Sequence, residues 1–533
     1  KYKNIGFISD KIIVNINNDL IKIKGDFENK INLNLLSNFL DYDFKKYFEE
    51  KILLSSSSNF DISFNKKFKI KNYNFSSQIN IDKIKINLKN TNLKNYIIDF
   101  EDKIILKNPR LTYSIDNQNI TTINISSEYM FNEKQKAKDI SLYYSKSNSI
   151  ESYKLYIDLI ENILNFNEID FVKKKDEEMF LNLTASKNKN FYEIKNFKMF
   201  NDKNIFSLKN IKFGKKFKIK DFKSIEAKYY NTVGFMNDIS IKKINNNIKL
   251  NSKSFDISSN IEKSLKSTNK NNFLDIFQNL NSSVNINFKL AKLDDKHNLI
   301  NLSGKGVIKN NKVDKVNISG KFNEKNNFTF TKDDLDGNKV TTIFSDYAKP
   351  FVKKFKFIKG FEGGKLDYTS TEINDDLSKS ELRIYDFKLQ DMPALTKLLS
   401  LASLQGIADL ATGEGIRFNE FDMFFENSDN LIKINEIYAL GPAISILMEG
   451  YVEKKNLVSL RGTLVPATTI NKTISKIPLV GDILVGKKMG EGVFGVSFKI
   501  KGPPDDLDTR VNPIKTLTPR FITRTLDKIK KTN

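Results

Sequence analysis

The sequence predicts a mainly β protein in which a long, twisted antiparallel sheet forms an open hydrophobic groove, with a few amphipathic helices. The stretch FGVSFKI at 494–500 alternates apolar residues with Gly, Ser and Lys, which places its apolar side chains on one face of a strand. Similar short segments, separated by Asn, Asp, Ser and Lys, recur along most of the 533 residues. A repeating sheet in which each strand contacts mainly its neighbours avoids the size limit of a single globular core.

Residues 1–270 are predicted to form an N-terminal segment of this groove. Alternating stretches such as 21–27 (IKIKGDF) and 68–75 (FKIKNYNF) follow one another at a spacing typical of an antiparallel meander. Two stretches, 39–53 and 152–164, instead carry apolar residues four positions apart. That spacing predicts amphipathic helices, which we expect to cross the groove.

Residues 271–390 are predicted to form a central groove segment. It begins with a third helical stretch at 272–280 and continues with shorter, glycine-punctuated strands. The apolar stretch 347–358 (YAKPFVKKFKFI) between these strands is compatible with a short helix or a strand.

Residues 391–533 are predicted to form a distinct C-terminal module. It begins with an amphipathic helix that ends near Gly413, continues with further strands, and closes with a basic amphipathic helix that Thr518 can cap. Such a helix can lie on an anionic membrane or cap the end of a sheet, and the sequence favours neither. The predicted membrane-contact residues are Arg520, Phe521, Arg524, Leu526, Lys528 and Ile529.

Composition closes most catalytic routes, so we expect a protein that is not an enzyme and has no cofactor or metal site. The chain has no Cys and one His, His297, which excludes disulfides, thiolate chemistry and a typical zinc site. We expect His297 on an exposed loop. The stretch GDILVGKK at 481–488 departs from a phosphate-binding P-loop because Lys488 replaces the metal-binding Ser or Thr. The adjacent Asp505 and Asp506 are interpreted as turn residues.

The net charge of +23 is compatible with nucleic acid or an anionic membrane as a partner. Only seven of the 87 basic residues are Arg, the side chain best suited to phosphate and base recognition. We therefore expect Lys to solvate the outer face of strands, without nucleic-acid binding. No run of 18 apolar residues predicts a transmembrane helix. The start at Lys1 suggests a piece of a longer protein, which leaves open an anchor upstream.

The alternating apolar faces suggest a trough that shelters acyl chains, at about 0.8 kcal/mol per buried CH₂. The alternative is an ordinary sandwich core, in which the same residues meet a second sheet. The predicted groove-lining residues are Phe328, Phe330, Ile444, Ile446, Met448, Phe494, Val496, Phe498 and Ile500.

The C-terminal part of the chain resembles the AsmA-like family, specifically its YhdP class, over some 140 residues. The resemblance is carried by the order and spacing of four stretches. They are MPALTKLLSLASLQGIADLATGEGIRFNEFD (392–422), YALGPAISILMEGYVE (438–453), LRGTLVPATTINKTISKIPLVGDILVG (460–486) and GEGVFGVSFKIKGPPDDLDTRVNPIKTLTPRF (490–521). Leu507 departs from the family, which usually has Pro there. The upstream residues fit the family only as a strand-rich pattern.

The resemblance implies a bridge-like lipid-transfer protein of a Gram-negative-type envelope. It would lie in the periplasm, anchored in the inner membrane by an N-terminal segment and reaching toward the outer membrane or a partner there with its C-terminus, and its groove would conduct phospholipids between the two membranes. Roughly 30–40 strands at ~4.8 Å span on the order of 150–190 Å, more than one bilayer of ~40–45 Å. The sequence leaves open a non-transporting envelope tether or outer-membrane assembly factor, and a surface β-fibre.

Overall fold

The chain is mainly β in the computed structural model, which describes residues 6–514 apart from 18, 33–47, 49–51, 89–90, 259–272, 353–359, 375, 391–395, 397–414, 429, 454–455, 467–494 and 504–505. About 70% of these described residues are in strands and 4% in helices. The chain divides into two compact units: unit 1 comprises Lys1–Phe255 and Phe273–Asn281, and unit 2 comprises Asp256–Asn272 and Ser282–Asn533.

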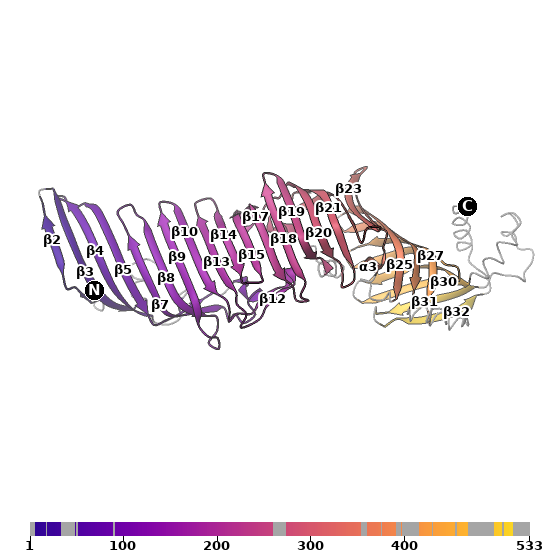
Figure 1. Cartoon of the computed structure of the whole chain (residues 1–533), viewed down its shortest axis with the longest axis horizontal. Helices are drawn as coiled ribbons and strands as arrows, with labels where there is room; N and C mark the ends of the chain where they lie inside the picture. Colours follow the sequence, from indigo (N-terminus) through magenta and orange to yellow (C-terminus); the bar gives the residue numbers. More distant parts are fainter. Residues whose placement is uncertain are drawn as a thin grey trace, which may run out of the picture. The chain divides into compact units, whose positions relative to one another are not determined.

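Unit 1 is an antiparallel meander in which strands pair largely in chain order (Figure 1). Its strands are β1 (Phe7–Ile8), β2 (Ile12–Ile16), β3 (Leu20–Asn32), β4 (Leu53–Asn65), β5 (Ile70–Ile81), β6 (Lys83–Asn87), β7 (Lys103–Ile115), β8 (Thr121–Met130), β9 (Lys138–Ser147), β10 (Ile150–Asp158), β13 (Phe180–Lys187), β14 (Tyr192–Phe200), β15 (Ile205–Phe213), β16 (Ile219–Asp221), β17 (Ser224–Tyr230), β18 (Met236–Ile244) and β19 (Asn247–Asp256). The strands β11 (Leu164–Phe166) and β12 (Phe171–Lys173) form a separate two-stranded sheet.

Unit 2 is a second antiparallel meander, in which each strand pairs with the next one along the chain. Its elements are β20 (Ser282–Lys292), β21 (Asn298–Lys309), β22 (Lys312–Lys321), β23 (Asn327–Leu335), β24 (Asn338–Ser345), α3 (Lys349–Val352), β25 (Phe361–Asn374), β26 (Leu377–Leu389), β27 (Ile416–Asn427), β28 (Leu431–Leu440), β29 (Ile444–Glu453), β30 (Leu457–Pro466), β31 (Gly495–Gly502) and β32 (Asp508–Ile514). The sheet is not closed into a barrel, so the predicted fold class is confirmed.

Tight turns that favour Asn, Asp and Gly keep neighbouring strands in register. Asn148 between β9 and β10 has φ 53°, and Asn310 and Asn311 between β21 and β22 have φ 49° and 63°. Asp336 and Gly337 between β23 and β24 also have positive φ, at 52° and 81°. Asn, Asp and Gly tolerate this left-handed conformation, which two-residue hairpin turns require. Many of the Asn residues that separate the alternating segments are therefore hairpin residues.

The helical prediction for 152–164 is wrong, because residues 150–158 form strand β10. Leu155, Leu159 and Ile163 have helical spacing, but Tyr153, Leu155 and Ile157 also alternate with a period of two. Leu159 instead lies beyond the strand, where it is buried in a hydrophobic cluster. The period of two prevails here because both edges of β10 pair, with β9 and with β13.

The other predicted helices have different outcomes. The stretch 39–53 lies outside the described residues except for 48, 52 and 53, and Leu53 opens β4. Within 272–280, a four-residue 3₁₀ helix, η5 (Phe273–Ile276), is formed. Within 347–358 the described part contains the short helix α3, while 353–359 lie outside the described residues.

Unit 1 has a packed hydrophobic cluster to which segments outside the long strands contribute. These segments supply Ile97, Phe100, Leu159 and Phe171, which pack with sheet residues such as Phe206. The Phe171 and Phe206 rings meet edge-on with centroids 4.9 Å apart. The remaining buried members are Ile31, Ile52, Leu54, Ile81, Ile84, Leu106, Tyr129, Phe131, Leu164, Met179, Met199 and Tyr229.

A buried ammonium group binds a loop that contributes to this cluster. Lys173, the last residue of β12, has a relative exposure of 1%. Its Nζ donates hydrogen bonds to the carbonyl oxygens of Leu159, Ile160 and Asn162 at 2.6, 2.7 and 2.8 Å. Burial lowers the pKa of Lys173 to about 8, because the charged form loses its hydration. The lysine therefore holds together a loop that has no regular secondary structure.

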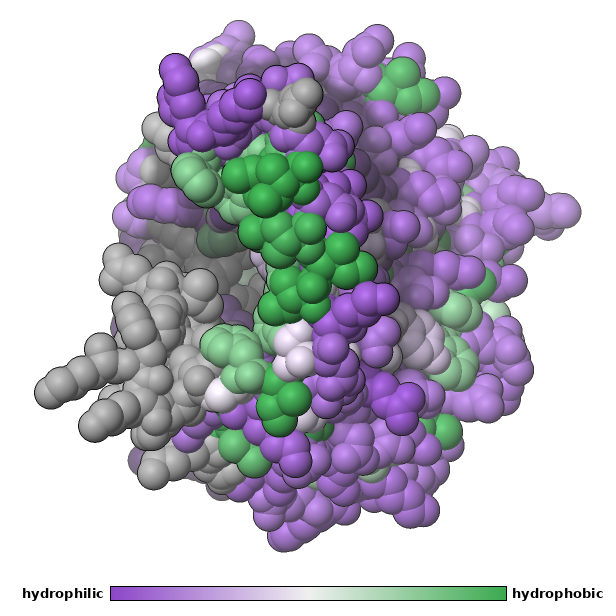
Figure 2. Space-filling view, turned by 90° about the vertical axis from the view of Figure 1, so that its left-hand side faces the viewer, coloured by the Kyte–Doolittle hydropathy of each residue, from purple (hydrophilic) through white to green (hydrophobic). Residues whose placement is uncertain are grey.

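The β1–β2 edge of unit 1 is apolar and exposed. Among the described strands, β2 pairs only with β3, and Ile12, Val14 and Ile16 on one face of β2 are 58%, 53% and 73% exposed. Figure 2 views this end of the molecule and shows hydrophobic surface gathered there. The apolar face of the sheet therefore continues to this edge.

Candidate functional site

An unbroken row of apolar side chains crosses eleven strands of unit 1, from β5 to β19. Residues that pair directly across strands point to the same face of a sheet, so the pairing register defines the row. Its members, in order, are Ile79, Leu111, Ile125, Leu142, Leu155, Leu183, Phe197, Leu208, Ile225, Ile241 and Leu250. We call this set the unit 1 apolar row. All eleven are half-buried, so each keeps part of its surface accessible.

The opposite face of the same strands is polar. Ser126, Ser141, Lys154 and Asn196 each neighbour a member of the row in sequence, and all four are exposed. Because successive side chains of a strand point to opposite faces, the sheet has one apolar and one wet surface. Lys and Asn side chains of these strands, such as Lys154 and Asn196, solvate the second surface.

Polarity on the apolar face changes with position along the strands. On β9 and β10, Leu142 pairs with Leu155, and two residues further on Tyr144 pairs with Tyr153. These tyrosine rings contact each other, with centroids 5.3 Å apart. Beyond them the face ends in the charged residue Glu151. Along these two strands, the side chains of this face therefore change from aliphatic to tyrosine and then to charged.

Unit 2 carries a comparable row across all thirteen strands from β20 to β32. Its members, in order, are Ile286, Gly304, Ile318, Phe330, Ile343, Tyr368, Leu382, Met423, Ile437, Met448, Gly462, Phe498 and Val511. We call this set the unit 2 apolar row. The backbone of β22 lies so close to Gly304 that a Cβ there would be 2.0 Å from the Asn317 carbonyl oxygen, so this position requires glycine.

The predicted groove-lining residues that the structure describes share one face of unit 2. Three belong to the unit 2 apolar row: Phe330, Met448 and Phe498. Phe328, Ile444, Ile446, Val496 and Ile500 lie two or four residues from row members on the same strands and hence on the same face.

The burial of these residues differs along the row. Phe330 and Met448 are half-buried, whereas Ile444 and Val496 have 0% exposure. Most of the others are buried in the unit 2 hydrophobic cluster, with Phe361, Phe387 and Phe418 as neighbours in it. Their contact with a ligand stays a prediction, since packing alone accounts for the fully buried ones.

Several predicted features lie outside the described residues. They include Phe494, the membrane-contact helix residues Arg520, Phe521, Arg524, Leu526, Lys528 and Ile529, the stretch 481–488 and Asp505.

His297 lies in the loop between β20 and β21, as expected, but its side chain is only 11% exposed, so the prediction of an exposed histidine is wrong. Its Nδ1 lies 2.8 Å from the Asp294 carboxylate, and its ring contacts Tyr347 at 5.2 Å between centroids. No group of three or more potential metal-binding side chains occurs among the described residues.

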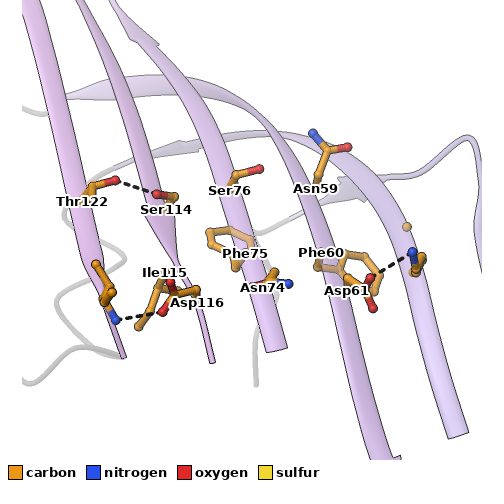
Figure 3. A pocket seen from close by; sticks show the side chains of 13 residues that line it. Asn59, Phe60, Asp61, Asn74, Phe75, Ser76, Ser114, Ile115, Asp116 and Thr122 are labelled. Atoms are coloured by element: carbon orange, nitrogen blue, oxygen red, sulfur yellow. Dashed lines mark hydrogen bonds and ion pairs between the residues drawn. The ribbon is translucent and has the colours of Figure 1, made fainter. Parts of the chain in front are cut away.

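A shallow depression of about 470 Å³ lies over β3, β4, β5, β7 and β8 (Figure 3). Its lining is mixed, with Asn59 and Asn74 beside the rings of Phe60 and Phe75. Both rings already pack against Phe27, with centroids 6.2 and 6.3 Å from it. The depression lacks the continuous apolar wall that an acyl chain needs, so the apolar rows are the better candidate site.

A group of ion pairs lies at a register shift between β21 and β22. Asp314 of β22 stands where this pairing shifts, and its carboxylate contacts the Lys309 and Lys339 ammonium groups at 2.7 and 2.6 Å. Hydrogen bonds from these two lysines lower the pKa of Asp314 to about 2. This group holds three strands together, because Lys339 comes from β24.

The unit 1 apolar row was missed by sequence reasoning, which placed its predicted lining residues only in unit 2. The signal was present: INIS at 123–126 and YKL at 153–155 contain the alternation. In the second stretch it was hidden by the apparent helical spacing. Within the described part of the chain, no helix is long and apolar enough to cross a membrane.

Comparison with known proteins gives no assignment. No protein-family model matches the chain, and no curated protein matches it.

Proposed function

We propose that the chain is a non-enzymatic conduit for phospholipids, which moves them between the inner and outer membranes of a Gram-negative-type envelope. Acyl chains would slide along the apolar rows, while headgroups stay at the water-facing side. The observation that carries this proposal is the unit 1 apolar row, in which eleven half-buried aliphatic or aromatic side chains follow one another without a polar interruption.

The dimensions of the row favour transport over a single binding pocket. Ten steps between neighbouring strands at about 4.8 Å give a path of roughly 48 Å in unit 1 alone. Such a path exceeds the ~30 Å hydrocarbon core that two opposed lipid leaflets fill. A site built for one lipid would instead be a cleft or cavity that buries most of that lipid's surface.

The energetics favour passive sliding. Each methylene that leaves water for an apolar surface contributes about 0.8 kcal/mol, and this gain is similar at every member of an unbroken aliphatic row. A charge in the row would remove this favourable free energy for the methylenes beside it, and it would therefore create a barrier to movement of the acyl chain. Movement along the row needs no side-chain chemistry, so the direction of transport would be set by the supply of lipid at its ends.

The test is a charge placed on one face or the other of the same strand. Leu142→Asp introduces a carboxylate into the row, and Ser141→Asp introduces the same carboxylate on the exposed polar face one residue away. Both variants and the unchanged protein are purified without detergent and incubated with phospholipid vesicles. Bound lipid per chain is then counted by native mass spectrometry, and transfer of labelled phospholipid between donor and acceptor vesicles is timed.

We expect several phospholipids on the unchanged protein, equal loading on Ser141→Asp, and at least roughly fivefold less loading and transfer with Leu142→Asp, because a buried charge costs more than about 1 kcal/mol. Far-UV circular dichroism checks that both variants fold. Equal transfer by the two variants would contradict the conduit. A folded, empty unchanged protein would favour the alternative, a non-transporting tether or assembly factor, and recovery away from envelope membranes in cell fractionation would contradict the proposed location.

A further inference from the structure

A charged interruption occurs in the outermost row of the apolar face of unit 1. This rim row, read by direct strand pairing, consists of Phe75, Ile115, Thr121, Lys146, Glu151, Lys187, Tyr192 and Phe213. Apolar or aromatic side chains and one Thr stand on both sides, and three charged side chains stand together in the middle. We call Lys146, Glu151 and Lys187 the charged triad.

The triad is positioned by the sheet itself. Glu151 on β10 pairs directly with Lys146 on β9 and with Lys187 on β13, so both lysines flank one carboxylate. The Lys187 Nζ lies 3.6 Å from the Glu151 carboxylate and 5.7 Å from the centroid of the Tyr192 ring. The Tyr153 hydroxyl donates a hydrogen bond to Glu151. Contacts from its own strand and from β13 therefore fix the carboxylate.

The charge of the triad is +1 at neutral pH. The hydrogen bond from Tyr153 lowers the pKa of Glu151, so the carboxylate stays ionised and neutralises one of the two lysines. Side-chain exposures of 40% for Lys187 and 23% for Glu151 leave the group accessible. One positive charge remains at the rim of an apolar face, which matches the single negative charge of a phosphodiester.

The layers below the triad match the rest of a phospholipid. The Tyr144–Tyr153 pair lies two residues deeper along β9 and β10, and the Leu142–Leu155 pair of the unit 1 apolar row lies two residues deeper again. Tyrosine suits the boundary between acyl chains and water, because its ring is apolar and its hydroxyl is polar. At about 3.3 Å per residue, the triad stands roughly 13 Å along the strand from the leucines.

We infer that the charged triad is a docking point for the phosphate of a lipid headgroup whose acyl chains lie on the unit 1 apolar row. This inference rests on the proposed function and adds to it a headgroup chemistry: a lipid that bears a phosphate is held at this point, and a lipid with the same chains and no phosphate is not. Lys146 and Lys187 bind the phosphate oxygens, and Glu151 limits the strength of that contact, so that the lipid is released again.

The experiment compares two lipids that have the same acyl chains and differ in the phosphodiester headgroup, which only one of them carries. Purified full chain is incubated with vesicles that contain a phospholipid and diacylglycerol with identical acyl chains in equal amounts. Protein is separated by flotation, and the two bound lipids are quantified by mass spectrometry. The variants are the double change Lys146→Gln with Lys187→Gln, and Glu151→Gln. The control is Lys154→Gln with Lys209→Gln, which removes two exposed lysines of the polar face.

We expect the bound ratio of phospholipid to diacylglycerol to fall roughly fivefold in the Lys146→Gln/Lys187→Gln variant, as for loss of partly exposed charge contacts. It should rise in Glu151→Gln, whose triad has a charge of +2, and stay unchanged in the control. A ratio that the triad variants leave unchanged, while lipid still loads, overturns the headgroup site and leaves the conduit standing. No loading of either lipid on the unchanged protein overturns the conduit itself.

A parallel arm separates a lipid phosphate from a free anion. Inorganic phosphate and glycerol phosphate are added during loading at millimolar concentration. Little competition is expected, because these anions lack the acyl chains that supply most of the binding energy. Displacement of phospholipid at low free-phosphate concentration would overturn the lipid assignment in favour of a simple anion site.

Discussion

Replacing Lys173 by Met tests the buried ammonium group of unit 1. Met has a similar length but no donor, so the carbonyl oxygens of Leu159, Ile160 and Asn162, now bonded at 2.6, 2.7 and 2.8 Å, lose this partner. A buried polar group left without a partner costs about 1–3 kcal/mol. The change also relieves the penalty of burying a charge, so we expect a net loss of about 2–4 kcal/mol in the free energy of unfolding at pH 7.

The same change has a predictable pH dependence. The pKa of Lys173 is about 8 in the folded protein, against an ordinary value of 10.5 for lysine, so between these values the unfolded chain binds more protons. Unfolding therefore becomes harder as the pH rises through this window, and the contribution is absent below pH 8. The unchanged protein should gain about 2 kcal/mol between pH 7 and 9.5 that Lys173→Met does not gain.

The assay is urea unfolding followed by far-UV circular dichroism at pH 7, 8, 9 and 9.5, since the chain has no Trp for fluorescence. Lys174→Met is the matched control, because it removes the same charge from an exposed neighbour and should change stability by less than about 0.5 kcal/mol. The difference in stability between the unchanged protein and Lys173→Met should therefore change from pH 7 to 9.5. A constant difference would refute the assignment of a charged lysine buried among carbonyl oxygens.

Two further predictions concern unit 2. Gly304→Ala places a Cβ 2.0 Å from the Asn317 carbonyl oxygen and should cost about 2–3 kcal/mol, whereas Gly306→Ala, with 3.2 Å to its nearest atom, should cost less than about 1 kcal/mol. Hydrogen exchange of β21 and β22 measures both, and equal protection in the two variants would contradict the steric argument. Asp314, with its pKa lowered to about 2, stabilises the fold above the unfolded pKa and loses that contribution as pH falls through 2. Asp314→Asn should therefore flatten the acid dependence of the circular dichroism signal between pH 4 and 2, and an unchanged acid titration curve would speak against the ion pairs.

Much of the fold follows from local pattern. Alternation in stretches such as 494–500 and the frequency of Asn in turns are enough to predict antiparallel strands, because hairpin pairing depends on neighbours in sequence. The meander of both units has this local character. The register could not be predicted from the sequence, although register decides which residues form a row. A shift by one residue would have exchanged the two faces.

The misread element shows where periodicity fails. Leu155 fits both a helical and an extended spacing, so the stretch 152–164 offers two interpretations of similar quality. Pairing with β9 and β13 decides between them, and pairing is a property of the whole sheet. The candidate site was harder to predict than the strands. Phe330 and Val496 show the same alternation in sequence, yet Phe330 is half-buried and Val496 is fully buried.

The chain-order pairing of the strands makes the length of the apolar path adjustable in steps. Removing the hairpin β8–β9 with its turn would leave β7 and β10 antiparallel, with Leu111 opposite Leu155 and the row still continuous. Adding a hairpin would lengthen the path by about 9.6 Å, or two strand spacings. Such a sheet can be lengthened or shortened by gain or loss of hairpins, without redesign of the surfaces that remain.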